Sequence, residues 1–203
     1  MNRSSAPRPV TGFKRPAHRV RWWIRGGICC LALWALLPLV PMPIVDCPCD
    51  HARPETLSSR VCSLCGTAED RTSEVYFLKD INPHKPNRYL ALPKAHRNGF
   101  QSTYDLSESL RARLWLAAAK RAQELYPGRW GLAQNSHFFR TQCHAHIHIG
   151  PLSPEVEDTG GRLFESVEEF PDLGSEQGMW VHPREGKYCF HTERDLAEIV
   201  LVR

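Results

Sequence analysis

Three histidines, His144, His146 and His148, alternate with small or apolar residues in the segment 142–150 (QCHAHIHIG). Side chains of a β-strand point to opposite faces in turn, so the pattern predicts a strand on which the histidines line one face at steps of about 6.5 Å. The three intervening residues then enter a core: Ala145, Ile147 and Ile149. Imidazole titrates near neutral pH, binds metals and attacks phosphorus. The row of histidines therefore indicates a metal site, a phosphoryl-transfer site, or both.

The charge of the chain is unevenly distributed. Seven of the 26 basic residues precede Asp46 and no acidic residue does, so the remainder carries 19 basic against 22 acidic side chains. A nucleic-acid-binding domain places its basic residues on the folded surface, where they release counterions. The slightly acidic remainder therefore argues against nucleic acid as a partner, and the basic excess belongs to the tail 1–25.

An apolar segment, residues 26–45, follows the basic tail and contains no charged side chain. Twenty apolar residues in a helix can span a bilayer, although Pro38, Pro41 and Pro43 interrupt helical hydrogen bonding in the last third. We expect a single N-terminal membrane span, with a cleaved signal sequence and a segment of a soluble protein as alternatives. The positive-inside rule keeps the tail in the cytoplasm and places the domain outside it, while a domain on the cytoplasmic side stays open.

Four cysteines crowd residues 46–74, which precede the first predicted strand: Cys47, Cys49, Cys62 and Cys65. The two-residue gap between Cys62 and Cys65 is that of a zinc knuckle, in which two thiolates reach one tetrahedral ion. In an exported domain the same cysteines are alternatively expected to pair as disulfides.

Alternating or apolar runs predict strands at residues 74–78, 88–92 and 130–134, and one long helix at 105–126. Asp105, with Glu108 three residues on, is expected to cap that helix, and Pro127 and Gly128 end it. After residue 151 a polar loop leads to predicted strands at 179–183, 187–192 and 197–202. This C-terminal β extension, residues 151–203, is expected either to cover the site or to extend the sheet.

Three segments resemble the histidine triad (HIT) superfamily: residues 77–83 (FLKDINP) followed by Pro86, residues 92–96 (LPKAH), and residues 144–149 (HAHIHI). Their order and spacing agree with the family, and Cys62 and Cys65 match the CxxC at the start of many bacterial members. The resemblance covers residues 62–150. It implies an α+β fold with a HIT-like catalytic core at 75–150, in which the histidine strand lies centrally in an antiparallel sheet crossed by one main helix.

Residues 133–136 (AQNS) and 140–142 (RTQ) resemble the corresponding stretch of CDP-diacylglycerol pyrophosphatases, a membrane-anchored branch of the HIT-like group. The CxxC and residues 80–83 (DINP) resemble the soluble branch instead. The expected substrate is therefore a nucleotide or a nucleotide-lipid, including a CDP-lipid diphosphate. Many HIT domains dimerise, and the sequence leaves a homodimer open.

The resemblance also implies roles for single residues. His146 is the expected nucleophile, which forms a nucleotidyl-histidine intermediate, and His148 is expected to bind the phosphate oxygens. Four further positions match nucleotide-binding residues of the family: Asp80 for the ribose, and Asn135, Arg140 and Thr141 for the phosphates. The implied activity is that of a nucleotide phosphohydrolase or nucleotidyl transferase.

A structural zinc ion is the cofactor that the resemblance implies. Its expected ligands are Cys62, Cys65, His96 and His144, a closed set that would also fix the strand carrying His146. Two other classes of function stay open at this point. The chain could be a non-catalytic zinc-bearing nucleotide-binding or interaction module, or a metal-storage or redox domain that uses its cysteine and histidine clusters.

Overall fold

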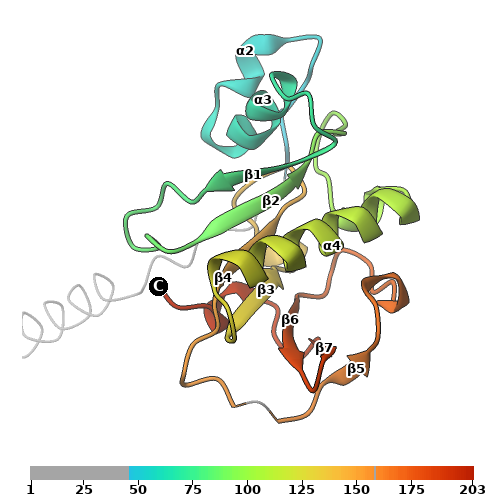
Figure 1. Cartoon of the computed structure of the whole chain (residues 1–203). Helices are drawn as coiled ribbons and strands as arrows, with labels where there is room; N and C mark the ends of the chain where they lie inside the picture. The colour runs from blue at the N-terminus through green and yellow to red at the C-terminus, as the bar shows by residue number, and fades with distance from the viewer. Residues whose placement is uncertain (1–45, 158) are drawn as a thin grey trace, which may run out of the picture. The chain divides into compact units, whose positions relative to one another are not determined.

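The computed structural model of the chain describes residues 46–157 and 159–203 (Figure 1). The two predicted N-terminal parts, the basic tail 1–25 and the apolar segment 26–45, lie outside these ranges. Among the residues that the structure describes, no helix is both long and apolar enough to cross a membrane.

Seven strands form one antiparallel sheet in the order β1-β2-β4-β3-β6-β7-β5. The strands are β1 Val75–Lys79, β2 Tyr89–Pro93, β3 Trp130–Gln134, β4 Ile147–Pro151, β5 Arg162–Phe164, β6 Met179–Arg184 and β7 Lys187–His191. The α+β class and the antiparallel sheet are thus confirmed. Strand β4 lies inside the sheet, between β2 and β3, but begins only at Ile147. Of the three histidines, only His148 lies on the strand, while His144 and His146 occupy its irregular approach, which we call the β4 lead-in (residues 140–146).

Helix α4, Glu108–Leu125, crosses one face of the sheet (Figure 1). Its buried residues recur at helical spacing, as in Leu110, Leu114 and Ala118, and they pack against Ile147 and Ile149 of β4. The predicted start at Asp105 is wrong. Asp105 ends the short 3-10 helix η2, Thr103–Asp105, the extended backbone of Leu106 interrupts the helical run, and the Ser107 hydroxyl caps α4 by accepting from Leu110 N at 3.3 Å.

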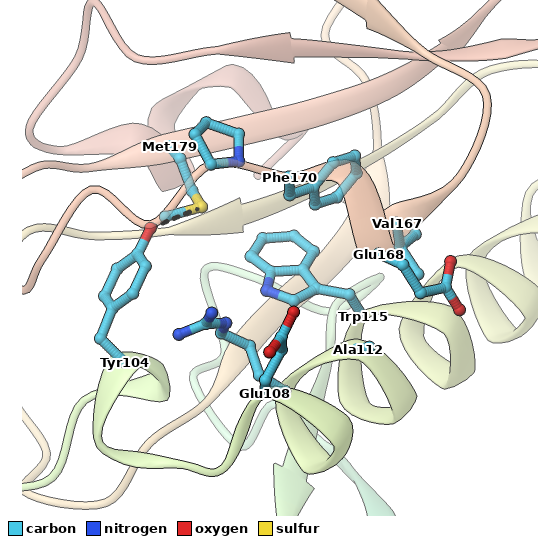
Figure 2. A pocket seen from close by; sticks show the side chains of 10 residues that line it. Tyr104, Glu108, Ala112, Trp115, Val167, Glu168, Phe170 and Met179 are labelled. Carbon is cyan, nitrogen blue, oxygen red and sulfur yellow. Dashed lines mark hydrogen bonds between the residues drawn. The ribbon is translucent and has the colours of Figure 1, made fainter.

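Helix α4 also packs against the 3-10 helix η4, Val167–Glu169, and the residues that follow it (Figure 2). The Trp115 and Phe170 rings meet edge to face with centroids 5.6 Å apart, and the Tyr104 hydroxyl donates to Met179 Sδ at 3.6 Å. The hollow between these side chains measures about 40 Å³. A space of this size holds a water molecule or two, so we regard it as a packing gap and not as a ligand site.

Residues 46–74 form a small helical cap beside β1 (Figure 1), which contains α2 Pro54–Leu57, η1 Arg60–Cys62 and α3 Ser63–Glu69. Two disulfides hold this N-terminal cap: Cys49–Cys62 closes it internally, and Cys47–Cys143 ties it to the residue before His144. The backbone N–H of Cys143 also donates to the Val61 carbonyl at 2.8 Å. The cap and the β4 lead-in therefore form one cross-linked unit.

The C-terminal extension continues the same sheet, because β6 pairs with β3 and β7 pairs with both β6 and β5. The strand predicted at 197–202 is wrong: Ala197–Val200 form the 3-10 helix η5, and Leu201 makes a single bridge to Leu152. Ala197, Val200 and Leu201 are buried on the sheet face opposite α4. Their spacing of three and four residues is helical, and the alternation of a strand is absent from it.

Candidate active site

A cavity of about 630 Å³ opens between the N-terminal cap, strands β1 and β2, the β4 lead-in and η5. His146 and His148 line it together with the four residues predicted to bind nucleotide, which are Asp80, Asn135, Arg140 and Thr141. The structure thus brings these six predicted residues around one space. His144 belongs to a different group of side chains, described below.

The ring of His146 is fixed by the backbone of its own lead-in. His146 Nδ1 donates to the His144 carbonyl at 2.8 Å, which leaves the Nε2 electron pair as the second functional atom of the ring. Among the described residues no hydrogen bond engages Nε2, and the side chain lines the cavity. Burial, reinforced by the neighbouring His148 and Arg140, lowers the pKa of His146 well below its usual value, so the ring is neutral at neutral pH.

His148 lies on β4 with its ring edge-on to that of His146, the two centroids 4.9 Å apart. Its Nδ1 lies 3.7 Å from Glu198 Oε2. Burial lowers the pKa of His148, although the Glu198 carboxylate opposes the shift. The two histidines therefore present neighbouring neutral rings, of which one faces a carboxylate from the C-terminal extension.

Glu198 is held by two cations. Arg88 Nη1 donates to Glu198 Oε2 at 2.8 Å, and Lys85 Nζ contacts the same oxygen. The Arg88 guanidinium is buried and also donates to the carbonyls of Leu201 and Val202 at 2.5 and 2.9 Å. Burial alone would raise the Glu198 pKa, but His148, Lys85 and Arg88 together lower it to about 2. These bonds hold residues 198–202 against the cavity, and the Glu198 carboxylate forms a negatively charged part of its wall.

Asn135 and Arg140 are already engaged by the protein. Asn135 exchanges two hydrogen bonds with Glu198, donating from Nδ2 to Oε1 at 3.2 Å and accepting at Oδ1 from the Glu198 N–H at 2.9 Å. Arg140 Nη2 donates to the His144 carbonyl at 2.7 Å, and its guanidinium lies over the Phe100 ring at 4.8 Å. Burial lowers the Arg140 pKa to about 10, which keeps the group charged at neutral pH. Both residues line the cavity while they support its walls.

Asp80 and Thr141 reach the cavity from two connecting segments. Asp80 directly follows β1, and its Oδ1 accepts from the Asn82 N–H at 2.9 Å, which stabilises the turn between β1 and β2. Thr141 is an exposed residue of the β4 lead-in. Between them the cavity has an apolar side formed by Leu64, Leu78 and Leu90.

The predicted set of four zinc ligands is not assembled. Cys62 is bonded to Cys49, so its sulfur is no thiolate ligand, and this part of the prediction is wrong. The other three predicted ligands, Cys65, His96 and His144, do converge, with ligand atoms within 4.8 Å of one another. We call these three residues the cap cluster. His51 and Glu69 adjoin it through His96, and they form a second overlapping group of metal-binding side chains.

Three imidazole nitrogens at the cap cluster are buried without a hydrogen-bond partner among the described residues: His51 Nε2, His96 Nδ1 and His144 Nδ1. His144 Nε2 donates to the Pro93 carbonyl at 2.8 Å, so its Nδ1 carries an electron pair. A buried acceptor without a partner is costly, and a metal ion would remove that cost. Burial raises the Cys65 pKa to about 11, so a metal would displace the thiol proton. The donor set fits a metal ion held by Cys65, His96 and His144.

Sequence reasoning missed the acidic and basic residues that complete the cavity, above all Glu198 and Lys85. Glu198 did leave a signal, because it is the one charged residue in the otherwise apolar run 196–202 (LAEIVLV). Lys85 lies in a turn bounded by prolines, and no sequence pattern marked it as a cavity residue. No protein-family model matches the chain.

Proposed function

We propose that the protein is a HIT-type nucleotide phosphohydrolase or nucleotidyl transferase that acts through a nucleotidyl-histidine intermediate on His146. The observation that carries the proposal is the fixed tautomer of His146 on the wall of a cavity of about 630 Å³. A neutral imidazole with an available Nε2 electron pair is a nucleophile that needs no separate base.

The reaction has two displacements at one phosphorus atom. In the first, His146 Nε2 forms a bond to phosphorus, and the P–O bond to the leaving group breaks with its electron pair on the departing oxygen. In the second, a water molecule or another hydroxyl attacks the same phosphorus and releases its proton to solvent, and the P–N bond breaks with its electron pair on Nε2 to restore neutral His146. The His144 carbonyl accepts from Nδ1 throughout and stabilises the positive charge that the ring acquires in the intermediate.

Two cations at the cavity support phosphate chemistry. Arg140 and Lys85 both line it, and fixed positive charge in a buried site stabilises the charge that develops on phosphoryl oxygens. His148 adjoins His146 and is proposed to donate a hydrogen bond to a phosphate oxygen. Asp80 and Thr141 are proposed to contact the ribose and the phosphates.

The finer proposal concerns the substrate. Leu64, Leu78 and Leu90 give the cavity an apolar part of its lining, in which Leu90 lies directly across from His148 in the sheet, and Ile81, which also lines the cavity, is 97% exposed. A nucleotide joined through a diphosphate to a lipid has both the charge and the apolar surface for such a cavity. A CDP-lipid is therefore the substrate that we place first, with simple nucleotide conjugates next.

The cap cluster is proposed to hold a structural zinc ion through Cys65, His96 and His144, with His51 in the place predicted for Cys62. Such an ion would supply no chemistry to the substrate and would fix the lead-in that carries His146. The two disulfides support a location outside the cytoplasm, where the apolar segment 26–45 would act as the membrane anchor.

Turnover of CDP-diacylglycerol and of simple nucleotide conjugates by the wild-type chain and by His146→Ala tests the proposal. His84→Ala, which removes an exposed histidine outside the cavity wall, is the matched control. We expect turnover by the wild type and the control only, and a phosphohistidine trapped by acid-free quenching in these two proteins. Equal turnover by His146→Ala would remove His146 from the mechanism.

The second candidate is a non-catalytic zinc-bearing nucleotide-binding or interaction module. It is favoured by Asn135 and Arg140, whose polar atoms are committed to Glu198 and to the His144 carbonyl. Nucleotide binding by the wild type that is equally tight in His146→Ala, with no turnover and no trapped phosphohistidine, would support this candidate against the enzyme.

A further inference from the structure

The hairpin β6–β7 gathers three metal-binding side chains far from the predicted motif. Its turn residues, Glu185 and Gly186, have φ values of 56° and 76°, as the tight two-residue turns of twisted hairpins require. The register sets His182 opposite Cys189 and Trp180 opposite His191. Residues two apart on a strand share a face, and so do residues opposite each other.

One face of the hairpin therefore carries Trp180 and three side chains that bind metals, which we call the hairpin cluster: His182, Cys189 and His191. The other face enters the main core through Val181 and Phe190. The hairpin cluster is buried too, with exposed fractions of 2%, 0% and 3% in that order. Buried polar groups of this kind are retained only where they find partners.

The three ligand atoms stand close to the separations found around one transition-metal ion. His191 Nε2 lies 3.2 Å from His182 Nε2 and 3.2 Å from Cys189 Sγ, and all three atoms lie within 4.8 Å of one another. Ligands bound at about 2.0–2.3 Å in a tetrahedral shell are about 3.3–3.8 Å apart. A small adjustment of the side chains would thus accommodate the ion.

Both imidazoles are oriented with Nε2 toward this point. His182 Nδ1 lies 3.2 Å from the Pro183 carbonyl, and His191 Nδ1 lies 3.5 Å from Glu193 Oε1. These acceptors favour the proton on Nδ1, so that two Nε2 electron pairs converge beside a thiol. A carboxylate or carbonyl behind a histidine is the usual arrangement at metal sites, since it fixes the ring and raises its basicity.

The surroundings of the hairpin cluster add rigidity and charge. The Trp180 indole stacks on His191 at 3.7 Å between centroids, and its N–H donates to Glu193 Oε1 at 2.9 Å. A hollow of about 510 Å³ meets His191, and among its described lining residues are the carboxylates of Glu155, Glu157 and Glu193 and one cation, Arg194. An acidic approach of this kind raises the local concentration of cations.

The backbone of Gly161 lies so close to the hairpin cluster that the Cβ of any other residue would collide with the ligand atoms. A Cβ atom at this position would lie 2.7 Å from Cys189 Sγ and 2.7 Å from His191 Nε2, and its φ is +76°. The neighbouring Gly160 has almost the same φ, +77°, yet a Cβ there would meet nothing within 4 Å. Substitution of either glycine therefore imposes a similar backbone strain, but only a substitution at Gly161 also brings a side chain against the ligand atoms.

We propose that His182, Cys189 and His191 form a metal site for a zinc-class divalent transition ion, separate from the cap cluster. One thiolate with two imidazoles is a donor set for zinc or copper and a poor one for magnesium or calcium. The ion takes the Cys189 thiol proton's place, and this proton goes to solvent. The proposal does not rest on the hydrolase activity, because no residue of the hairpin cluster lines the cavity of His146.

Cobalt binding to the full-length chain, purified in detergent with its disulfides intact, tests the site. Because each cluster contains one thiol, a Cys65→Ser chain isolates the hairpin cluster. We expect this chain, freed of metal and then loaded with Co²⁺, to retain one equivalent and to show a thiolate-to-cobalt charge-transfer band. The band should disappear in Cys65→Ser/Cys189→Ser. A folded Cys65→Ser chain without the band, judged by near-ultraviolet circular dichroism, would overturn the proposal.

A second comparison covers the case in which Cys65→Ser does not fold. Zinc analysis of the wild type and of Cys189→Ser should then differ by one equivalent, whatever the cap cluster holds. Equal zinc contents would overturn the site.

Gly161→Ala and Gly160→Ala provide the matched pair. We expect Gly161→Ala to weaken Zn²⁺ binding at the hairpin cluster at least tenfold and Gly160→Ala to leave it within twofold, because only the former places a methyl group on the ligand atoms. Equal affinities of the two variants would show that Gly161 does not cover an occupied site, and would count against the proposal.

Discussion

The cap cluster and the hairpin cluster use the same side chains but are built in different ways. Cys65, His96 and His144 come from three separate parts of the chain and meet because the Cys49–Cys62 disulfide closes the N-terminal cap and the Cys47–Cys143 disulfide ties it to the β4 lead-in. The hairpin cluster spans ten residues and follows from strand register alone. One site depends on cross-links between distant loops, and the other on local backbone hydrogen bonds.

The clusters also differ in their relation to the cavity. His144 lies two residues before His146, and its carbonyl oxygen accepts the hydrogen bond from His146 Nδ1. Any ion bound by His144 at the cap cluster is therefore coupled to the proposed nucleophile. On the sheet face opposite α4, the register runs from His148 through Ala133 and Trp180 to His191. Three strand spacings of about 4.8 Å thus separate His148 from the hairpin cluster. The difference indicates a supporting role for the first cluster and an independent role for the second.

The largest expected effect distinguishes His144 from His146 within the lead-in. We expect His146→Ala to lower turnover by at least about a thousandfold, because this side chain acts on the substrate, and to lower the melting temperature less than His144→Ala does, because His146 faces the cavity and belongs to neither metal cluster. His144→Ala should lower turnover as well, with a loss of zinc and about 2–4 kcal/mol of stability, because it removes a buried, hydrogen-bonded side chain. Single-turnover assays, metal analysis and thermal melts measure the three quantities. Similar melting temperatures for the two variants would mean that the cap cluster does not support the fold.

Most residues of the cap cluster were predicted from the sequence. The hairpin cluster was not predicted, although the sequence contains signals for both clusters. Cys65, His96 and His144 were expected from the resemblance to the HIT superfamily and do converge, whereas Cys62, expected from the same resemblance, pairs with Cys49 instead. Spacing identifies candidate ligands, but it cannot tell which of several nearby cysteines oxidise together. That choice depends on how α2 and α3 bring Cys49 and Cys62 side by side.

Most strands were predicted within a residue or two, since apolar alternation is a local property. The errors fell where tertiary contacts decide. Ala197–Val200 form η5 and pack, with Leu201, on Trp180 and Leu152, and α4 starts at Glu108 because Leu106 adopts an extended conformation. Recognising Glu185 and Gly186 as a hairpin turn would have placed His182 opposite Cys189 and revealed the hairpin cluster from the sequence.

Loss of the disulfides should affect the two clusters unequally. Cys47–Cys143 closes a loop with a sequence separation of 96, and its removal by a double serine substitution is expected to cost on the order of 4 kcal/mol. The cap cluster should then release its metal in a mild chelator, while the hairpin cluster keeps its own. Urea unfolding and zinc retention measure both effects. Parallel release from both clusters would contradict the idea that only one of them depends on cross-links.

Substitution of Glu198 tests how the C-terminal segment, which follows the hairpin cluster in the chain, supports the cavity. Its pKa is about 2 in the folded chain against an ordinary value of 4.5, so its stabilising effect is present above pH 4.5 and is lost as the pH falls toward 2. We expect Glu198→Gln to lower the free energy of unfolding by about 2–3 kcal/mol at pH 7, because Arg88 then stays buried without its carboxylate. The difference from wild type should shrink steadily between pH 4.5 and pH 2.

Glu124→Gln is the control, since Glu124 pairs with Arg121 on the surface of α4. Unfolding curves at a series of pH values should show a change below about 0.5 kcal/mol for this variant at every pH. A pH-independent difference between Glu198→Gln and wild type would mean that the Glu198 charge does not stabilise the fold.

The smallest expected effects concern two matched carboxylates, Glu69 beside the cap cluster and Glu193 beside the hairpin cluster. Glu69 Oε1 lies 3.5 Å from His96 Nε2, and Glu193 Oε1 lies 3.5 Å from His191 Nδ1. Each carboxylate therefore faces the ring nitrogen that is turned away from the proposed ion. Loss of such a partner typically weakens metal binding by about 10–100-fold, because the ring becomes less basic and less firmly oriented.

We expect Glu193→Gln to weaken zinc binding at the hairpin cluster about tenfold, at the lower end of that range, since the amide oxygen can still accept from Trp180. Glu69→Gln should do the same at the cap cluster, and neither variant should alter the other site. Competition with a chromophoric chelator, in chains that keep only one of the two cluster cysteines, measures each affinity separately. If Glu193→Gln weakened both sites equally, the clusters would be coupled across the sheet, and the distinction between a supporting and an independent site would fail.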